Sequence, residues 1–517
     1  MLRKFFLAIT VLISSVGYSQ DLPTNFHVGS QPLYKVSDST PASNSIERIL
    51  IQGNTIWLAT SDGLSKSTDN GENWTNYYKT QPFGDENVSA IGYDNGKIWA
   101  ATWHIETKFG RDLPVGSGIK YSIDQGLTWS SIDQPVDLQN DTVTVYGSNS
   151  LKTVPKINGE ENFVYGFAFT KNTIWIVSAR GGLRKSIDNG KTWQRVLLPP
   201  DEKDSIKPTE PLNFKIDPNN IANHIAFSIY AVDDQLVYVG TQGGLNKSTD
   251  GGISWTKFTR SNQVKHIIGS NVFAINRNLQ DNSIWVSSVP LDYPGVSVSY
   301  DGGENWENYL SGEQVRDFGF KYYGNPGAYT GAEVFAASGN GLFRTSNNGT
   351  TWISAPPIID DATKTPANTN KFLSVEPQKK DDGTYSIWIG SSGAGLIRLN
   401  ESNGFWSGNW KVYLTKEKVA SSSETYAFPN PFSPDFESIK IVYSTSQTDN
   451  VTIRVFDFGM NLVKTVLQNA GRGMSDEQIV SWDGRNEAGR IVPNGVYFYR
   501  IDIGSGTPLF GKIMVMM

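Results

Sequence analysis

The sequence predicts an all-β protein: a seven-bladed β-propeller followed by a small immunoglobulin-like β-sandwich. Two observations predict the propeller. A short pattern, Ser/Thr-x-Asp-x-Gly-x-x-Trp, recurs along the chain, and an apolar run rich in β-branched and aromatic residues precedes each copy. Repeats of this kind indicate an architecture built from similar units. The sandwich is predicted by a third observation, because the repeats stop near residue 415 and alternating apolar residues follow.

The first nineteen residues predict a secretory signal peptide. They begin with Arg3 and Lys4, continue through an apolar run and end in small residues at 17–19, which is the usual order of a cleaved export signal. We expect cleavage before Gln20. The alternative is an N-terminal membrane anchor, which is disfavoured because the apolar run is short for a bilayer crossing. No later segment reads as a membrane-spanning helix, so none is expected in the mature chain.

Composition and charge exclude several classes of function. The net charge of −6 gives no general attraction for nucleic acid. The chain has no cysteine, which excludes disulfides, thiolate metal sites and a cysteine nucleophile. Its four histidines are dispersed without ligand spacing, and its acidic turns lack the pattern of a calcium loop. Glycine pairs lead into strands, not into phosphate-binding helices. We therefore expect no metal site and no cofactor.

Seven apolar runs predict the second strands of seven repeated units. The runs are residues 55–60, 97–102, 173–178, 236–241, 283–288, 333–338 and 386–391. Another apolar stretch, such as 163–169, precedes each run, and a Gly-led strand and the repeated pattern follow it. Each unit thus reads as four short antiparallel strands. Seven such units arranged radially form a β-propeller, which we expect to span residues 20–415.

The repeated pattern falls at the turn between the third and fourth strands and is called the box below. Its Asp can accept hydrogen bonds from the turn's own N–H groups, and its Gly supplies a conformation that a Cβ disfavours. The Trp begins the outer strand and can pack back over the turn. The box is therefore interpreted as a structural staple. Its residues are Asp69 and Trp74, Asp124 and Trp129, Asp188 and Trp193, Asp250 and Trp255, Asp301 and Trp306, and Asn347 and Trp352 in a sixth copy where Asn replaces Asp.

The box resembles the Asp-box, or BNR repeat, of sialidases, xyloglucan-cleaving glycosidases, sortilin-type receptors and photosystem assembly factors. Five copies match the pattern fully; in the seventh unit only Trp410 remains. The resemblance implies a β-propeller. Because the box occurs in enzymes and non-enzymes alike, the resemblance does not choose between them.

Strand order predicts which loops share a face. If the boxes lie on the turns between third and fourth strands, the turns between second and third strands lie on the opposite face, with the connections between units. The longest excursions there are residues 103–117, 137–162 and 197–220. Long loops on one rim of a rigid scaffold commonly carry binding sites, and in sialidase-like relatives this face holds the active site. We expect units two to four to build the site.

The candidate ligand-binding residues are Trp103, His104, Glu106, Arg111 and Arg180. An aromatic ring beside charged groups suits a carbohydrate or a peptide. The alternative interpretation is that Trp103 packs beneath its own loop, and that Glu106 and Arg180 are solvated or paired.

An enzymatic function requires more. Glycoside hydrolysis usually needs two facing carboxylates, and Asp62, Glu106, Asp112 and Glu160 could supply a pair by position. No residue stands out, so the catalytic residues stay unknown. A sialidase would also need an arginine cluster for the substrate carboxylate and a characteristic N-terminal signature. The sequence lacks that signature, and its arginines are scattered.

After a Ser-rich linker at 416–425, residues 426–517 predict a small sandwich of short antiparallel strands. The stretches YAFPNPFSP (426–434), VFDFGMNLV (455–463), WDGRNEAGRIVPNGVYFYR (482–500) and GKIMVMM (511–517) resemble the FlgD-type immunoglobulin-like domain that ends many type IX secretion substrates. The resemblance implies passage through the outer membrane, then release or lipid-linked attachment at the surface. The chain lacks the basic finish common in such tails. The carboxylates of residues 482–489 are expected to fix that turn.

Together these observations predict an exported binding or adhesion module, secreted or held at the outer-membrane surface. Its expected partners are an extracellular glycan or protein and, through the tail, the secretion machinery; we expect a monomer. A purely structural adhesion protein is a second possibility. The alternative function is a xyloglucanase-like or sialidase-like glycoside hydrolase with a carboxylate pair on the loop-rich face.

Overall fold

The computed structural model describes residues 39–108, 111–367, 369–402, 404–415, 425–435, 438–473 and 475–517. The expected signal peptide lies outside these residues, as does most of the expected linker. The described residues form two compact units, one before residue 416 and one after it. Strands dominate both units, and the only helical element among these residues is the 3-10 turn η1 (Ala222–His224). The all-β fold class is therefore confirmed.

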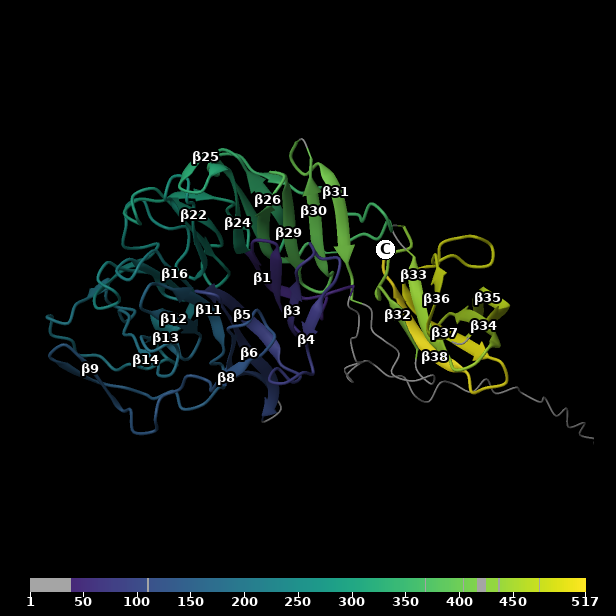
Figure 1. Ribbon diagram of the computed structural model, residues 1–517, viewed down its shortest axis with the longest axis horizontal. Helices are drawn as coiled ribbons and strands as arrows, with labels where there is room; N and C mark the ends of the chain where they lie inside the picture. The colour runs from purple at the N-terminus through teal and green to yellow at the C-terminus, as the bar shows by residue number, and fades with distance from the viewer. Residues whose placement is uncertain are drawn as a thin grey trace, which may run out of the picture. The chain divides into compact units, whose positions relative to one another are not determined.

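The first unit contains seven antiparallel sheets of four or five strands within the described residues (Figure 1). The first sheet is β1 (Ile46–Gln52), β2 (Thr55–Thr60), β3 (Gly63–Ser67) and β4 (Thr75–Tyr77). The second is β5 (Asn87–Asp94), β6 (Lys97–Lys108), β7 (Arg111–Ser122) and β8 (Ser130–Ile132). The third is β11 (Val164–Phe169), β12 (Ile174–Ser178), β13 (Gly182–Ser186) and β14 (Gln194–Arg195). A separate hairpin, β9 (Val143–Tyr146) and β10 (Asn149–Lys152), lies between the second and third sheets in sequence.

The fourth sheet is β16 (Ala226–Ala231), β17 (Val237–Thr241), β18 (Gly244–Ser248) and β19 (Trp255–Phe258), with β15 (Ser205–Ile206) added beside β19. The fifth is β20 (Val272–Arg277), β21 (Ile284–Ser288), β22 (Gly295–Ser299) and β23 (Glu307–Tyr309). The sixth is β24 (Val315–Asn325), β25 (Ala328–Ser338), β26 (Gly341–Thr345) and β27 (Ile353–Ser354). The seventh is β28 (Phe372–Lys379), β29 (Tyr385–Ser391), β30 (Leu396–Glu401) and β31 (Gly408–Tyr413).

The sheets are arranged radially around a central channel. The first strand of each sheet packs beside the first strand of the next, in the order β1, β5, β11, β16, β20, β24, β28, and β28 packs beside β1 again. Each sheet is built from consecutive strands, so the ring closes by contact between two complete sheets. At this closure Asn44 O accepts from Gly395 N (2.9 Å), and Asn44 Oδ1 accepts from Thr415 N (2.6 Å). This arrangement is a β-propeller.

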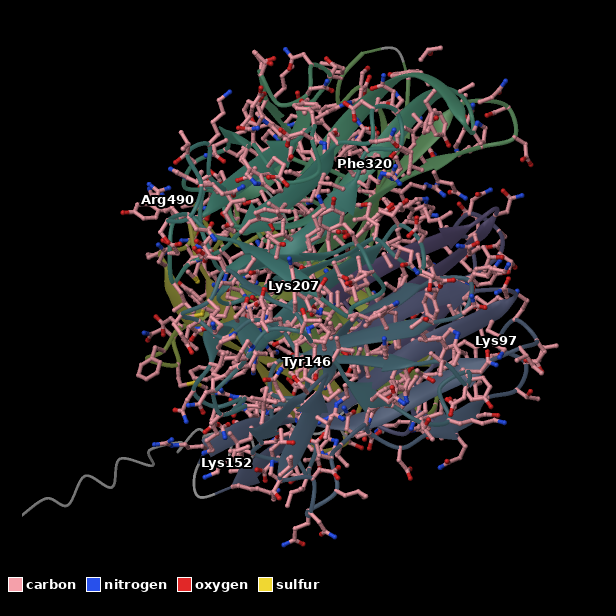
Figure 2. The ribbon with its side chains drawn as sticks, turned by 90° about the vertical axis from the view of Figure 1, so that its left-hand side faces the viewer. Lys97, Tyr146, Lys152, Lys207, Phe320 and Arg490 are labelled. Carbon is pink, nitrogen blue, oxygen red and sulfur yellow. The ribbon has the colours of Figure 1, made fainter. Side chains whose placement is uncertain are left out.

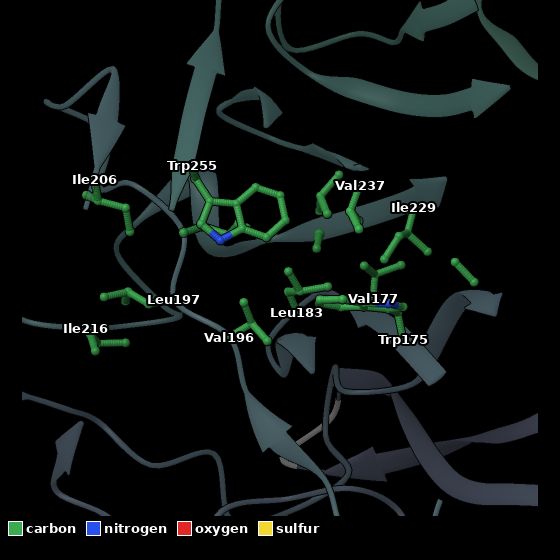
Figure 3. Packing of buried hydrophobic residues seen from close by; sticks show 14 of the residues in the cluster. Trp175, Val177, Leu183, Val196, Leu197, Ile206, Ile216, Ile229, Val237 and Trp255 are labelled. Carbon is green, nitrogen blue, oxygen red and sulfur yellow. The ribbon is translucent and has the colours of Figure 1, made fainter. Parts of the chain in front are cut away.

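The apolar second strands explain how neighbouring sheets pack. In β12 every residue is buried, as expected for a strand covered on both faces. Trp175 of β12 joins Val177, Val237 and Trp255 in one apolar cluster that spans the third and fourth sheets (Figure 3). Similar clusters lie along the other sheet boundaries. The core of this unit is therefore a ring of apolar layers between the sheets.

Each box holds its hairpin with one hydrogen-bond pattern. In the third sheet Ser186 Oγ donates to Asp188 Oδ1 (2.7 Å) and accepts from Gly190 N (2.8 Å). Asp188 also accepts from Thr192 N (2.9 Å) and Thr192 Oγ1 (2.6 Å). In the sixth sheet Asn347 takes the place of Asp and accepts from Thr351 N at 2.9 Å. The Ser or Thr that opens the box is thus as much part of the staple as the Asp.

The box also packs against the preceding sheet. Gly252 has a φ of +82°, and a Cβ at this position would lie 2.8 Å from the Trp175 ring of the third sheet. In the same turn Trp255 Nε1 donates to Gly252 O at 3.2 Å. The glycine is required both by the left-handed backbone conformation and by the close approach of the neighbouring tryptophan. The box therefore stabilises the contact between sheets as well as its own hairpin.

Acid is expected to weaken the boxes. Hydrogen bonds from Thr192 lower the pKa of Asp188 to about 2, and hydrogen bonds from Thr128 do the same for Asp124. The pKa of an Asp in an unfolded chain is about 3.9. A carboxyl group whose pKa is lower in the native state than in the unfolded state stabilises the native state at pH values above the unfolded pKa. This stabilisation is lost as the pH falls to the native pKa. The urea midpoint should therefore drop between about pH 4 and about pH 2, measured by tryptophan fluorescence. Asp188→Asn, which copies the natural Asn347, should shallow this slope; an unchanged slope would contradict the assignment.

The structure corrects one expectation about the loops. Residues 103–117 do not form a loop: β6 continues to Lys108, β7 starts at Arg111, and the two pair from Trp103↔Gly116 to Lys108↔Arg111. Residues 103–108 alternate between the two faces of a strand, but their charged residues make the run resemble a loop. Similarly, the connection 137–162 contains the hairpin β9–β10. There Tyr146, labelled in Figure 2, donates its hydroxyl to Ile253 O (2.6 Å) in the box of the fourth sheet.

The second unit is a sandwich of two sheets. One sheet has the order β32 (Thr425–Phe428), β33 (Ile439–Thr445), β36 (Ser475–Trp482). The other has the order β35 (Leu462–Arg472), β34 (Asp449–Phe456), β37 (Gly495–Ile503), β38 (Leu509–Val515). Side chains from both sheets share one buried apolar cluster around Trp482 and Tyr499.

The turn after Trp482 uses its carboxylates in two ways. Asp483 Oδ1 accepts from Arg485 N at 3.0 Å and so fixes the turn. Glu487 instead accepts from Thr465 N at 2.7 Å, which ties the turn to β35. Nowhere in the part of the chain that the structure describes does a helix have the length and apolar character needed to cross a bilayer.

Candidate binding site on the loop face

The loop face is the face of the propeller that carries the turns between second and third strands and the connections between sheets. In the third sheet, β11 begins at Val164, opposite Ser178, where β12 ends. The box begins at Ser186, opposite Ile174, at the other end of β12. Arg180 in its turn and the extended hairpin β6–β7 therefore lie on the face opposite the boxes, as does Asp62 between β2 and β3.

The hairpin β6–β7 carries a polar network centred on His104. His104 Nδ1 lies 2.8 Å from Ser117 Oγ and 3.2 Å from Glu86 Oε2, and His104 Nε2 lies 3.1 Å from Glu106 Oε1. Ser117 donates its hydroxyl proton to Glu86 at 2.6 Å. His104 and Glu106 come together here because they are two residues apart on one face of a strand.

Charge pairing sets the protonation states in this network. Burial lowers the pKa of His104, but hydrogen bonds to Glu106 and Glu86 outweigh it, and the net shift is upward. The ring therefore favours the imidazolium form, which donates from both nitrogens. Ser117 donates to the Glu86 carboxylate, so the His104 ring is not positioned to take the Ser117 proton.

Two of the candidate carboxylates are joined by a lysine. Lys108 Nζ lies 2.8 Å from Glu106 Oε2 and 2.6 Å from Glu160 Oε1. Its hydrogen bonds lower the pKa of both carboxyl groups. Asp112 accepts from Thr107 Oγ1 at 2.6 Å near the end of the hairpin. A general acid for glycoside hydrolysis needs a raised pKa, so Glu106 and Glu160 are poorly suited to that role.

Trp103 lies on the opposite face of the hairpin from His104. Its ring stacks on Phe163, with centroids 5.1 Å apart and planes 21° apart. Trp103 stays partly exposed, so the ring neither packs fully beneath its loop nor stands free. It forms a supported aromatic surface at the entrance to β11.

The two remaining candidate residues, Arg111 and Arg180, lie outside the His104 network. Arg180 Nη1 donates to Pro218 O at 2.9 Å, and Arg180 Nε lies 3.5 Å from Glu161 Oε2. Arg111 is exposed near the tip of the hairpin. The structure thus brings His104 and Glu106 into one network, whereas Trp103, Arg111 and Arg180 lie elsewhere on the loop face.

A second feature of the loop face is a ring of seven β-bulges at the channel mouth. Every inner strand has one extra residue, the third residue of β5 and the second residue of the other six strands, where its pairing register with the next strand shifts. The bulged residues are Glu47, Ser89, Tyr165, Phe227, Phe273, Arg316 and Leu373, and we call them the collar. All seven are partly exposed, whereas the residue before each is buried. Bulges re-aim side chains, and here one falls at the same level of every inner strand.

Aromatic residues of the collar continue the Trp103–Phe163 stack. The centroids of Phe163 and Tyr165 are 4.5 Å apart, those of Tyr165 and Phe227 5.4 Å, and those of Phe227 and Phe273 5.8 Å. The guanidinium of Arg316 lies over the Phe273 ring at 4.7 Å. One side of the channel mouth is therefore aromatic, and the array ends at a cation.

A cavity of about 160 Å³ lies at the collar. Collar residues Tyr165, Phe227, Phe273 and Arg316 line it together with Arg48 and Asp317. Its remaining walls are mostly apolar and include Ala90, Ile91, Phe167, Ile229, Ala274 and Ile275. Six of the seven inner strands contribute, so the cavity occupies the centre of the propeller.

Carboxyl groups in the channel differ from those on the hairpin. Loss of solvation raises the pKa of Asp317, and it raises the pKa of Glu376 to about 8 with the help of the nearby Asp317 charge. Burial also raises the pKa of Glu47. Among the described residues, no group of three or more His, Asp or Glu side chains is placed to hold a metal ion.

Sequence reasoning missed the collar and the partners of His104. Lys108 and Ser117 lie in residues 103–117, which the sequence predicts to be a loop, and Glu86 comes from a separate segment. The spacing from the bulged residue to the large aromatic residue of the next strand differs between sheets: it is ten residues from Tyr165 to Trp175, eleven from Phe227 to Tyr238 and twelve from Phe273 to Trp285. No fixed spacing in the sequence therefore marks the collar.

Comparisons with known proteins support the fold. No protein-family model matches the chain. A xyloglucanase, Xgh74A of Acetivibrio thermocellus, is 30% identical over 123 residues, which are 23% of this chain and 12% of that enzyme. An ancestral GH74 enzyme superposes with a TM-score of 0.51 at 14% identity, covering 93% of this chain and 63% of that one. The match to PorZ, a surface component of the type-IX secretion system of Porphyromonas gingivalis, covers 90% of this chain and 64% of PorZ, with a TM-score of 0.39 and 15% identity. The chain thus covers less than two thirds of each.

Proposed function

We propose that this chain is an exported binding protein that holds an extracellular glycan or protein on its loop face. The observation that carries the proposal is the partly exposed Trp103, held nearly parallel to Phe163 beside a charged hairpin. A fixed aromatic face covers apolar patches of a sugar or a side chain at a small entropic cost. Charged residues elsewhere on the same loop face, such as Arg111 and Arg180, supply further polar contacts to the bound partner.

We infer the delivery of this protein from its sequence. The boxes are those of the Asp-box repeat, and the second unit corresponds to a FlgD-type sorting domain of the type IX pathway. An apolar leader and a C-terminal domain of this kind together support export to the cell surface or the medium.

A glycoside hydrolase is the second candidate function. The identity of 30% over 123 residues to a xyloglucanase favours it. Such an enzyme needs a protonated carboxyl group near a second carboxylate. In the described residues, the carboxyl groups with raised pKa are in the channel, where Glu376 lies near Asp317. Cleavage would therefore depend on those two residues, and not on Glu106 or Glu160.

We expect the full chain to be retained on at least one immobilised polysaccharide or surface protein without releasing soluble products. Trp103→Ala should weaken retention roughly tenfold, equivalent to about 1.4 kcal/mol, because it removes the aromatic surface. Leu127→Ala is the matched control, since Leu127 is 84% exposed on the box face. Retention and reducing-end release are measured in the same tubes.

Different outcomes separate the two candidates. Product release that Asp317→Asn or Glu376→Gln abolishes would replace binding by hydrolysis. Equal losses of retention in Trp103→Ala and Leu127→Ala would show that the Trp103 surface of the loop face does not hold the partner.

A further inference from the structure

The two arginines at the channel cavity lack the partners that buried arginines have elsewhere in this protein. Arg344 is paired with both Glu333 and Glu401, and Arg184 lies 2.7 Å from Asp137. Within the described part of the chain, neither Arg48 nor Arg316 has a carboxylate oxygen within 4.0 Å of its guanidinium; Arg48 Nη1 donates to Glu47 O at 3.3 Å. Partly buried cations without a paired anion are unfavourable. Burial, then the Arg48 charge, lowers the pKa of Arg316, and the Glu47 charge opposes this shift.

The cavity beside these arginines is small, and apolar side chains form part of its walls. Its volume of about 160 Å³ is below the roughly 300 Å³ at which drug-sized pockets begin. Phe227, Phe273, Ile229 and Ile275 line it. A fully polar ligand such as a sugar residue would leave hydroxyl groups against these walls without partners. The cavity suits a compact apolar group, such as a single ring.

The arrangement of Arg316 defines where an anion would sit. Its guanidinium lies over the face of Phe273, which leaves the N–H groups on the edge of the plane free to donate. A carboxylate in that plane accepts two parallel hydrogen bonds from one guanidinium. A ligand with an apolar ring and one carboxylate would therefore place the ring against Phe227 and Ile229 and the carboxylate at the arginines.

We propose that the channel mouth is a binding site for a small apolar monocarboxylate of about one ring, whose carboxylate is held by Arg316 and Arg48. This site lies at the far end of the aromatic array that begins at Trp103, and it does not depend on the function proposed for Trp103. The collar supplies the site because each of its bulges turns one side chain toward the channel. Glu47 and Asp317, whose pKa values are raised, are the anionic groups nearest to the site.

The first test uses the unmodified full chain and three probes in isothermal titration calorimetry: benzoate, its neutral isostere benzamide, and acetate. Benzoate should bind with one-to-one stoichiometry. Benzamide should bind at least about tenfold more weakly because it lacks the charge, and acetate should bind at least about tenfold more weakly because it lacks the ring. The proposal would be overturned if benzoate did not bind at concentrations up to about 10 mM, or if benzamide bound with the same affinity.

The second test assigns the site. Arg316→Gln should weaken benzoate binding by about 10-fold to 100-fold, since hydrogen bonds to charged groups contribute about 1.5–3 kcal/mol. The matched control is Arg260→Gln, because Arg260 also stacks on an aromatic ring, Tyr293 at 3.8 Å, but outside the cavity. Binding that falls equally in both variants would overturn the assignment. If Arg316→Gln does not fold, Arg48→Gln takes its place in the same titration, with weaker benzoate binding as the expected result and unchanged binding as the result that overturns the assignment.

Discussion

Replacing Arg344 by alanine is expected to lower the free energy of unfolding of the propeller by about 3–5 kcal/mol. Arg344 is 1% exposed, donates to Glu333 Oε2 from Nε at 2.7 Å, and is also paired with Glu401. Lys321 Nζ lies 2.5 Å from Glu401 Oε2, so two cations balance two carboxylates between the sixth and seventh sheets. Removing one cation leaves an uncompensated buried negative charge, which is the costly way to break such a network.

The measurement is a urea titration of the full chain followed by tryptophan fluorescence. Every tryptophan except Trp482 precedes residue 416, so the signal reports the propeller. Arg398→Ala is the matched control: Arg398 is 10% exposed, but its carboxylate partner Glu72 is 57% exposed and can be hydrated when the arginine is lost. Its loss should be smaller than that of Arg344→Ala. Equal losses would show that burial of the network does not determine its contribution.

The strand pattern of the propeller could be predicted because it depends on local signals. The run TIWLAT was assigned to residues 55–60, and β2 spans Thr55–Thr60. A strand covered on both faces is continuously apolar, and few other elements share that pattern at this length. The spacing of the apolar runs also predicts that the boxes lie between the third and fourth strands. That position in turn predicts that the long loops lie on the opposite face.

The binding features were less predictable because they depend on register and on distant partners. His104 was chosen by residue type, but its partners Glu86 and Ser117 come from separate segments. Tyr165, Phe227 and Phe273 read as ordinary core residues in apolar runs. Only the bulges, which shift the register by one residue, turn them from the sheet interface toward the channel. A one-residue shift of this kind reverses which face a side chain occupies, and residue patterns do not reveal it.

Replacing Trp175 by alanine is expected to lower the free energy of unfolding by about 3–5 kcal/mol, the usual range for a large buried aromatic residue. The side chain is fully buried between the third and fourth sheets and packs in the cluster with Trp255 (Figure 3). Trp175→Phe should cost less, since Trp175 Nε1 has no hydrogen-bond partner among the described residues. Urea midpoints from fluorescence and circular dichroism test both variants, and a loss below about 1 kcal/mol for alanine would contradict the packing role.

The same site tests whether the box is a staple between sheets. Gly252→Ala on the unmodified chain must place a Cβ 2.8 Å from the Trp175 ring at a φ of +82°, so it combines a steric clash with backbone strain. In the Trp175→Ala background the clash is removed and only the strain remains, which costs about 1–2 kcal/mol. The second substitution should therefore destabilise the double variant less than it destabilises the original protein, and the difference is a coupling energy between two neighbouring sheets. Additive losses would mean that the box stabilises only its own hairpin, and that the glycine is required by the turn alone.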